Sequence, residues 1–231
     1  ILTLKAFDAA EKTESVPQDY PNVGNNYWAS SNIRDWLNSS AQGVSFSANA
    51  PVQAYVENGY NDYATEAGFL SGFTAKERAL IKSTNQKNAL DMLSYQAANE
   101  GGNQLLKYDS SFSNLMQNYA ECYKMNTSEK VFLLDIEQLY NYVYMNGFGL
   151  AKRPTASAVT LSEYKNDLLS ADKPWKYWLR TPRTEDNSSA RINYFGNNVL
   201  DDTAWNGTVG VAPALYINTS APIAGGSGTY A

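Results

Sequence analysis

Apolar residues at helical spacing mark four short segments of the chain. In the first segment, Ile33, Trp36 and Leu37 fall on one face, and Ser30 or Ser31 can cap the first turn. Each of the other three segments opens with a capping residue and carries a Glu or Gln three residues later, which is the pattern of a capping box. We expect helices over residues 31–38, from Thr74, from Asp135 to Gly147 or Gly149, and from Thr160.

Strands are predicted mainly in the last third of the chain, where aromatic and β-branched residues gather. The sequences YWLR, ARINYFG and VGVAPALYIN read as strands, and NNVLDDTAWNG reads as a turn-forming stretch before the last of them. Shorter strand signals occur in ILTLKAF, at the start, and in residues 131–134. Residues 39–68 give only weak strand signals. We interpret residues 86–126 as an insertion of mixed short elements and residues 221–231 as a flexible tail.

The rarest residue types restrict the chemistry of the chain. Its 231 residues include no His and a single Cys, Cys122. Serine–histidine–aspartate triads, cysteine–histidine dyads and zinc sites built from Cys and His are therefore excluded. Because one cysteine cannot form an intramolecular disulfide, cysteine usage leaves the cellular compartment open. We expect Cys122 to be a buried, inert thiol.

The charge and hydropathy of the chain argue against two classes of partner. A net charge of -5, without any cluster of Lys and Arg, is atypical of a nucleic-acid-binding protein. No stretch approaches the roughly 20 apolar residues of a membrane-spanning helix, so we expect no membrane insertion by this chain. The sequence begins with Ile, and we expect it to be a fragment of a longer protein whose N-terminal part would hold a signal or another domain.

Tryptophan and arginine residues within the apolar blocks are expected to be structural. The tryptophans expected to fill the core are Trp28, Trp36, Trp175 and Trp178. Trp205 lies in a polar segment and is the tryptophan that we expect at the surface. Arg34 and Arg180 are expected to form buried or half-buried ion pairs that hold the scaffold together, with Glu137 or Asp35 as candidate partners.

Six sequence blocks resemble, in content and order, those of a bacterial and phage domain family of unknown function. The blocks are YWASSNIRDWLN, GFTAKERALI, EKVFLLDIEQL, YWLRTP, ARINYFG and GVAPALYIN, and they span residues 27–218. The chain departs from the family pattern at Ala212, where the family usually has Arg, and at Asp135, where it usually has Ser. If that arginine helps to hold the final strands together, another group must take its place here.

The resemblance extends to the formylglycine-generating-enzyme branch of the C-type lectin fold. It implies an α+β, C-type lectin-like fold, a twisted antiparallel sheet with flanking helices and long loops, in a single domain over residues 1–220. The oxidase of that branch needs reactive cysteines, and Cys122 lies outside the C-terminal blocks, so we expect no enzyme activity. The calcium motifs of sugar-binding lectins are missing, since Trp205 and Asn206 are followed by Gly, so we expect neither a bound metal nor a cofactor.

A polar segment, residues 183–206, lies between two of the predicted strands. It is rich in Asn, Asp, Ser, Thr and Tyr, which offer many donors and acceptors at low cost in side-chain entropy, as antibody contact surfaces do. We predict that it binds a protein or glycan ligand on another cell, without a metal. The candidate contact residues are Arg183, Asp186, Asn187, Tyr194, Asn197, Asn198, Asp202, Trp205 and Asn206.

The family resemblance also suggests how such a segment would arise. Lectin-fold proteins are the usual display scaffold of diversity-generating retroelements, which mutate adenines near the end of a gene and so favour Asn codons. The composition of residues 183–206 resembles such a variable region, with GVAPALYIN as its fixed end. The resemblance implies a variable protein that is extracellular, on a bacterial cell surface or a phage virion.

Two alternatives to a variable binding protein remain at this stage. The chain could be a structural or carbohydrate-binding module of a bacterial surface protein. It could also be a glycan-acting enzyme that uses two carboxylates, for which Glu185 with Asp186, or Asp201 with Asp202, are the nearest pairs. Adjacent residues on a strand point to opposite faces, so neither pair is well placed to act as acid and base on one substrate.

Overall fold

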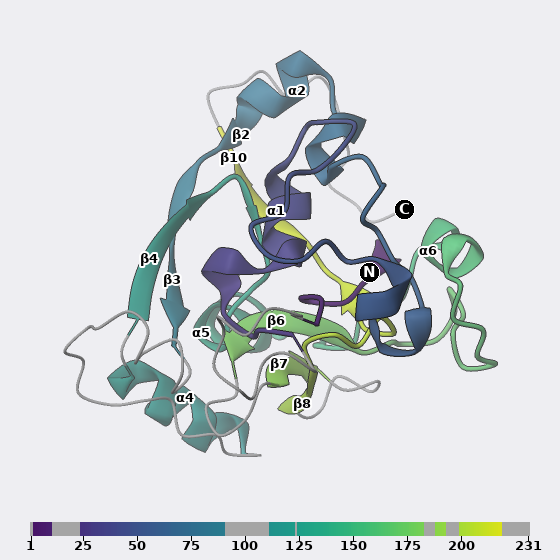
Figure 1. Ribbon diagram of the computed structural model, residues 1–231. Helices are drawn as coiled ribbons and strands as arrows, with labels where there is room; N and C mark the ends of the chain where they lie inside the picture. Colours follow the sequence, from purple (N-terminus) through teal and green to yellow (C-terminus); the bar gives the residue numbers. More distant parts are fainter. Residues whose placement is uncertain are drawn as a thin grey trace.

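Strands from both ends of the described chain meet in the main β-sheet. The computed structural model describes residues 2–10, 24–90, 111–122, 124–182, 188–192 and 199–218, and it combines helices and sheets in an α+β fold (Figure 1). The main sheet has the order β1 (Thr3–Leu4), β9 (Gly210–Val211), β6 (Tyr177–Pro182), β7 (Ser188–Ile192) and β8 (Val199–Thr203). β6 and β9 run parallel, whereas the other neighbouring strands are antiparallel.

Two smaller sheets connect the middle of the chain to its C-terminal part. In one of them, β10 (Ala214–Ile217) lies between β2 (Ile81–Lys82) and β5 (Val131–Phe132) and is antiparallel to both. In the other, β3 (Thr84–Ala89) pairs with β4 (Lys124–Glu129) along its whole length. Figure 1 shows β3 and β4 as a long, curved ribbon. Residues 91–110, a large part of the predicted insertion, lie outside the described residues, as does the predicted tail.

Three of the four predicted helix starts are confirmed. The helices are α1 (Asn32–Asn38), α2 (Ala75–Leu80) and α5 (Ile136–Gln138), which continues as a π-helix, η5 (Leu139–Tyr144). Ser31 caps α1, and α2 and α5 begin with complete capping boxes at Thr74 and Asp135. The chain turns away after η5 at Gly147, whose φ of +74° is a conformation that favours glycine.

The helix start predicted at Thr160 is wrong. The helix in this region, α6 (Ala156–Leu161), begins one turn earlier, because the Thr155 hydroxyl accepts a hydrogen bond from the Ala158 backbone N–H at 3.2 Å. The Glu163 N–H, which a capping box at Thr160 would require, instead donates to Asn61 Oδ1 at 2.9 Å. A long-range contact therefore overrides a local capping signal.

The C-terminal third differs from its sequence prediction at two points. The stretch predicted as a turn contains β8, which forms a regular antiparallel ladder with β7 from Val199 to Thr203. Backbone pairing with β7 supports a strand there despite the Asp residues that disfavour one. The predicted strand VGVAPALYIN is divided into β9 and β10, since Pro213, between them, has no backbone N–H to donate.

The remaining described helices are short, except for α4 (Phe112–Glu121), which has 10 residues. They are η1 (Trp28–Ser30), η2 (Gln53–Tyr55), η3 (Glu57–Gly59), η4 (Phe69–Gly72) and α4 (Phe112–Glu121). Residues 39–68, where weak strand signals were noted, therefore form 3-10 turns and loops rather than strands. In the part of the chain that the structure describes, no helix is long and apolar enough to cross a membrane.

The core is aromatic, and its buried tryptophans are hydrogen-bonded. The four tryptophans predicted to be buried are buried, which confirms that expectation. Each indole N–H reaches an acceptor from a distant part of the chain; for example, Trp178 donates to the Lys5 carbonyl at 2.8 Å and Trp28 to Glu129 at 2.9 Å. A second cluster, which includes Tyr119, Cys122 and Leu179, packs between α4, α5 and β6. The expectation of a buried Cys122 is thus confirmed.

Candidate functional site

Arg180, on β6, is the centre of a buried polar network. Its side chain is 1% exposed and donates hydrogen bonds to five acceptors. Two of these are the backbone carbonyls of Lys87, at 3.0 Å, and Leu133, at 2.5 Å. The side-chain acceptors are Asn88 Oδ1 at 2.9 Å, Gln138 Oε1 at 2.6 Å and Asp135 Oδ2 at 2.5 Å. All donors of the guanidinium group are therefore used to join β6 to β3 and to the start of α5.

Asp135 is the counter-ion of Arg180. The predicted ion pair of Arg180 is therefore confirmed, but its partner is Asp135 rather than Glu137. The carboxylate also accepts from the Tyr119 hydroxyl at 2.7 Å and, as the helix cap, from the Gln138 N–H at 2.7 Å. Burial, and then the neighbouring Asp135 charge, raise the pKa of Tyr119 far above its usual range, so its hydroxyl stays a donor. A serine at this position, usual in the family pattern, would cap the helix without supplying the negative charge.

Arg34 forms the second predicted scaffold ion pair. Its Nε lies 3.0 Å from Glu129 Oε1, and its Nη1 lies 4.0 Å from Asp35 Oδ1. Glu129 is fully buried and also accepts from the Trp28 indole. The half-buried pair is confirmed, and its main partner is Glu129, which lies 95 residues away in the sequence.

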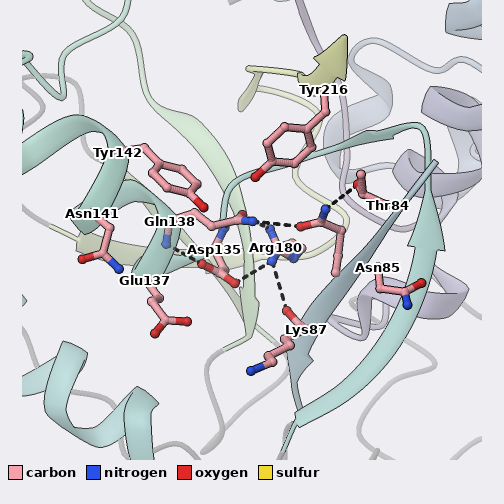
Figure 2. A pocket seen from close by; sticks show the side chains of 11 residues that line it. Thr84, Asn85, Lys87, Asp135, Glu137, Gln138, Asn141, Tyr142, Arg180 and Tyr216 are labelled. Atoms are coloured by element: carbon pink, nitrogen blue, oxygen red, sulfur yellow. Dashed lines mark hydrogen bonds and ion pairs between the residues drawn. The ribbon is translucent and has the colours of Figure 1, made fainter. Parts of the chain in front are cut away.

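A polar pocket lies directly above the Arg180 network (Figure 2). Its volume is about 540 Å³, which falls within the range of about 300–1,000 Å³ typical of small-ligand sites. Buried side chains, including Asp135, Arg180 and Gln86, form its base. The complete lining is Thr84, Asn85, Gln86, Lys87, Asp135, Glu137, Gln138, Asn141, Tyr142, Arg180 and Tyr216. Three separate parts of the chain, around β3, α5 with η5, and β10, therefore build one concave site around Arg180.

Two tyrosines from different elements line this pocket. Figure 2 shows Tyr142, from η5, and Tyr216, from β10, directed toward the Arg180 network. The Tyr216 ring packs on Phe132, with ring centroids 5.6 Å apart, and Tyr142 is its neighbour in the lining of the pocket. Partial burial, and then the neighbouring Tyr142, raise the pKa of Tyr216 to about 12. Both rings remain accessible, since Tyr142 is 54% and Tyr216 is 38% exposed.

Three of the nine sequence-predicted contact residues lie together in the described structure. Asp202, at the end of β8, and Asn206, in the turn that follows, form a polar cluster with Lys176, and Trp205 lies in the same turn. The other six lie outside the described residues, and their predicted role stays a prediction. These six are Arg183, Asp186, Asn187, Tyr194, Asn197 and Asn198.

The turn after β8 is held by its own polar side chains. Asp202 accepts from Lys176 Nζ at 2.9 Å and from Asn206 Nδ2 at 2.7 Å. Asn206 Oδ1 in turn accepts from the Thr208 N–H at 2.9 Å and from its hydroxyl at 2.7 Å. The Asn206 side chain is buried, whereas Trp205 is partly exposed. Asn206 is thus placed to shape the turn, and Trp205 is placed at the surface.

A second carboxylate, Glu57, lies near this turn. Its backbone N–H donates to the Trp205 carbonyl at 2.9 Å. Partial burial, and then the nearby Asp202 charge, raise the pKa of Glu57 above its ordinary value, although Lys176 opposes the shift. Within the described ranges, no group of three or more potential ligands among Cys, Asp and Glu is arranged to hold a metal ion.

The strand register divides the predicted contact residues into two groups. Pro182 pairs with Ser189, and Ser188 pairs with Thr203, so the end of β6, the start of β7 and the end of β8 lie together. Residues 183–187 join β6 to β7 at this end, which also holds the turn after β8. Residues 193–198 join β7 to β8 at the opposite end, about 14 Å away at ~3.4 Å per strand residue.

The pocket residues were missed by sequence reasoning because no local pattern connects them. Gln86 lies in a stretch whose composition predicted only mixed short elements, and Tyr142 is one of several tyrosines on the helix after Asp135. Tyr216 lies in a block interpreted as a structural strand. The one available signal was Arg180, which was assigned to an ion pair and whose position marks the base of the pocket.

Comparison with known proteins places the chain in a family. No curated protein and no solved structure matched the sequence. The family model described as "Domain of unknown function (DUF6273)" matches residues 9–219, which include almost all of the described structure. Because the match covers far more than half of the 231 residues, the chain belongs to the DUF6273 domain family.

Proposed function

We propose that this chain is a non-catalytic ligand-binding domain with a C-type lectin-like scaffold, whose binding face is built by residues 183–206. Its ligand would be a protein or glycan on another cell, bound without a metal or a cofactor. The domain would act outside the cell, on a bacterial surface or a phage virion. The observation that carries the proposal is the ordered turn after β8, in which buried Asn206 and paired Asp202 support a partly exposed Trp205.

The sheet next to this turn has the properties of a rigid support. Every residue of β6 is buried, and β8 is the last strand of the main sheet as described. Within the described residues, the indole N–H of Trp205 makes no hydrogen bond, unlike those of the four core tryptophans. A partly exposed aromatic ring with an unused donor, held by an ordered turn, is typical of a contact residue in a binding surface.

Substitution of Trp205 tests the binding face. Trp205→Ala should weaken binding to whole cells by at least about tenfold, because truncation of an aromatic anchor removes both its contact area and its donor. Leu161→Ala, which truncates an exposed side chain on α6, is the matched surface control. Binding is measured by flow cytometry with the labelled domain against a panel of bacterial strains. If Trp205→Ala binds as the unsubstituted chain does, or if no strain is bound, the proposal fails.

The origin of the segment has a separate test in the DNA around the gene. We propose that residues 183–206 are diversified by a retroelement, as the resemblance to variable lectin-fold proteins implies. A reverse-transcriptase gene should then lie nearby, with a near-identical copy of the sequence that encodes residues 183–218. The two copies should differ only where the template has adenine. If the reverse-transcriptase gene or the second copy is absent, the retroelement origin is refuted. The proposed binding face would then still be tested by the cell-binding assay of Trp205→Ala.

A further inference from the structure

The pocket above Arg180 is built without any residue of the proposed C-terminal binding face. Its lining comes from β3, α5, η5 and β10, with Arg180 alone contributed by β6. The inference that follows therefore stands independently of the function proposed above. It concerns a second binding site and the chemical class of ligand that this site would take.

The charges that line the pocket are balanced. Arg180 and Asp135 neutralise one another at the base, at 2.5 Å. Lys87 and Glu137 supply one further charge of each sign and form no ion pair within the described residues. A phosphate or another multiply charged ligand would thus find no excess of opposite charge in the pocket. A neutral ligand is favoured, since it leaves the buried pair intact.

Amide side chains near the base keep some hydrogen-bonding capacity. Gln138 Nε2 donates one hydrogen bond to Gln86 Oε1 at 2.8 Å, and Gln86 Nε2 donates one to Thr84 Oγ1 at 2.8 Å. A primary amide has two N–H groups, so each glutamine retains one for a ligand. At the rim, the side chains of Asn85 and Asn141 make no hydrogen bond within the described residues. The pocket therefore offers both donors and acceptors to a ligand.

The two tyrosines add accessible aromatic surface to these amides. Tyr216 is held by its strand and by its contact with Phe132, so little conformational entropy would be lost when a ligand packs on it. Tyr142 lies on the opposite wall and is more than half exposed. Aromatic rings beside neutral amides and hydroxyls suit a ligand with apolar C–H faces and many hydroxyl groups. Sugars are the common ligands with both properties.

We propose that this pocket binds a neutral saccharide of one or two sugar units. The free amide N–H groups of Gln86 and Gln138 would bind sugar hydroxyls at the base, and the ring of Tyr142 would pack against one face of the sugar. The hydroxyls of Tyr142 and Tyr216, which also line the pocket, would form further hydrogen bonds to the ligand. The volume of about 540 Å³ is in the range of small-ligand sites.

A glycan array probed with the intact chain tests this proposal. The array carries neutral glycans together with sialylated and phosphorylated glycans, and each hit is titrated with the free neutral sugar. Tyr142→Ala should weaken binding of a neutral glycan by about tenfold, as truncation of an aromatic anchor does. Asn141→Ala, a milder change at the exposed rim, should weaken it by a few-fold.

A matched control is provided by Tyr144, which has the same exposed fraction as Tyr142, 54%, and lies on the same helix but outside the pocket. Tyr144→Ala should leave binding unchanged. Melting temperatures of all variants establish that each is folded. If Tyr142→Ala does not fold, Asn141→Ala and the control decide the result.

The possible outcomes separate this site from the C-terminal face. Loss of neutral-glycan binding in Tyr142→Ala but not in Trp205→Ala supports the pocket, whatever the fate of the C-terminal proposal. Loss in Trp205→Ala but not in Tyr142→Ala overturns the pocket and assigns the glycan to the other face. The proposal is also overturned if no neutral glycan binds, if only charged glycans bind, or if Tyr144→Ala is as harmful as Tyr142→Ala.

Discussion

Two basic residues four positions apart, Lys176 and Arg180, are each paired with an aspartate, and they have different structural roles. Arg180 and Asp135 are almost fully buried, and Arg180 bonds with groups 42 to 93 residues away in the sequence. Lys176 and Asp202 are less buried, and within the described residues Asp202 is also bonded to Asn206, four residues away. The planar guanidinium group cross-links distant elements through several directed bonds, whereas the lysine contributes a single charge to a turn.

This difference separates the scaffold of the domain from the surface that the scaffold supports. The guanidinium donors of Arg180 are all used on side chains and backbone carbonyls of other elements, so a change there affects several elements together. The bonds of Asp202 and Asn206 within the described residues hold the turn after β8, so a change there should affect chiefly this turn. Substitutions in the two regions should therefore differ in their effect on stability.

The largest effect is expected for Arg180→Ala. Removal of the guanidinium group leaves the Asp135 carboxylate buried without its cation, which should lower the free energy of unfolding by about 3–5 kcal/mol. Urea denaturation followed by circular dichroism gives the value. Arg180→Lys keeps the charge but cannot reach all five acceptors, so it should also destabilise, by less. A loss below about 1 kcal/mol for Arg180→Ala would mean that the network is not the support of the fold.

Alkaline pH should destabilise the second core cluster. Burial raises the pKa of the Cys122 thiol from 9.0 to about 11. Above pH 9 the unfolded chain loses this proton before the folded chain does, so stability that is present below pH 9 is lost as the pH rises toward 11. The slope contributed by this group is at most about 1.4 kcal/mol per pH unit.

The contribution of Cys122 is isolated by comparing the chain with Cys122→Ala. Unfolding free energies are measured from urea curves below pH 9 and between pH 9 and 10. These two limits are the ordinary pKa values of a thiol, 9.0, and of a tyrosine, 10.0. The variant should show a smaller decline over that interval. Buried Tyr177, whose pKa is also raised by burial, should destabilise both proteins above pH 10. Identical slopes below pH 10 would contradict the assignment to Cys122.

A smaller effect is expected for Asn206→Ala. The substitution removes the acceptor of two bonds from Thr208 and the donor of one bond to Asp202, at the cost of about 1 kcal/mol. Thermal unfolding monitored by circular dichroism is sufficient to detect it. The prediction assigns Asn206 to the support of the turn rather than to direct contact with a ligand. If Asn206→Ala leaves the stability unchanged, Asn206 is not needed to hold the turn and remains a candidate contact residue.

The smallest effect on stability is expected for the double substitution of Asn197 and Asn198 by Ala. If these residues belong to the exchangeable part of residues 183–206, stability should change by no more than about 0.5 kcal/mol. The same melting measurement applies, with Asn206→Ala as the comparison. Cell binding by the double variant is measured in parallel and should fall. A stability loss as large as that of Asn206→Ala would place these residues in the scaffold.

The helices were more accessible to sequence reasoning than the sites. Capping by Ser31, Thr74 and Asp135 depends on groups within three residues, so the local sequence suffices to predict it. The failure at Thr160 arose where a distant side chain, Asn61, bonded the N–H that a local cap would need. The buried state of the core tryptophans was also predictable, because large aromatic side chains in apolar blocks have few alternatives.

The sites depend on contacts between remote segments, which a single sequence does not reveal. Arg180 was correctly expected to be paired, but Glu137 was named where the structure has Asp135, two residues earlier on the same turn. The pocket requires β3, η5 and β10 to lie close together, and the pattern of apolar and polar residues along the chain does not indicate this proximity. The division of residues 183–206 between the two ends of β7 follows from strand register, which the composition of the segment does not encode.

Because β9 and β10 follow residues 183–206 in the chain, the fold would distinguish between kinds of mutation in the DNA that encodes those residues. Both strands are translated after residues 183–206, and all their partners, β1, β2, β5 and β6, lie earlier in the chain than this segment. A base inserted or deleted in the segment would shift the reading frame and destroy both closing strands. Such a product would fail to complete its sheets and would be degraded by proteases that remove unfolded chains. Single-base exchanges would keep the frame, so the fold itself would select for point substitutions and against insertions or deletions.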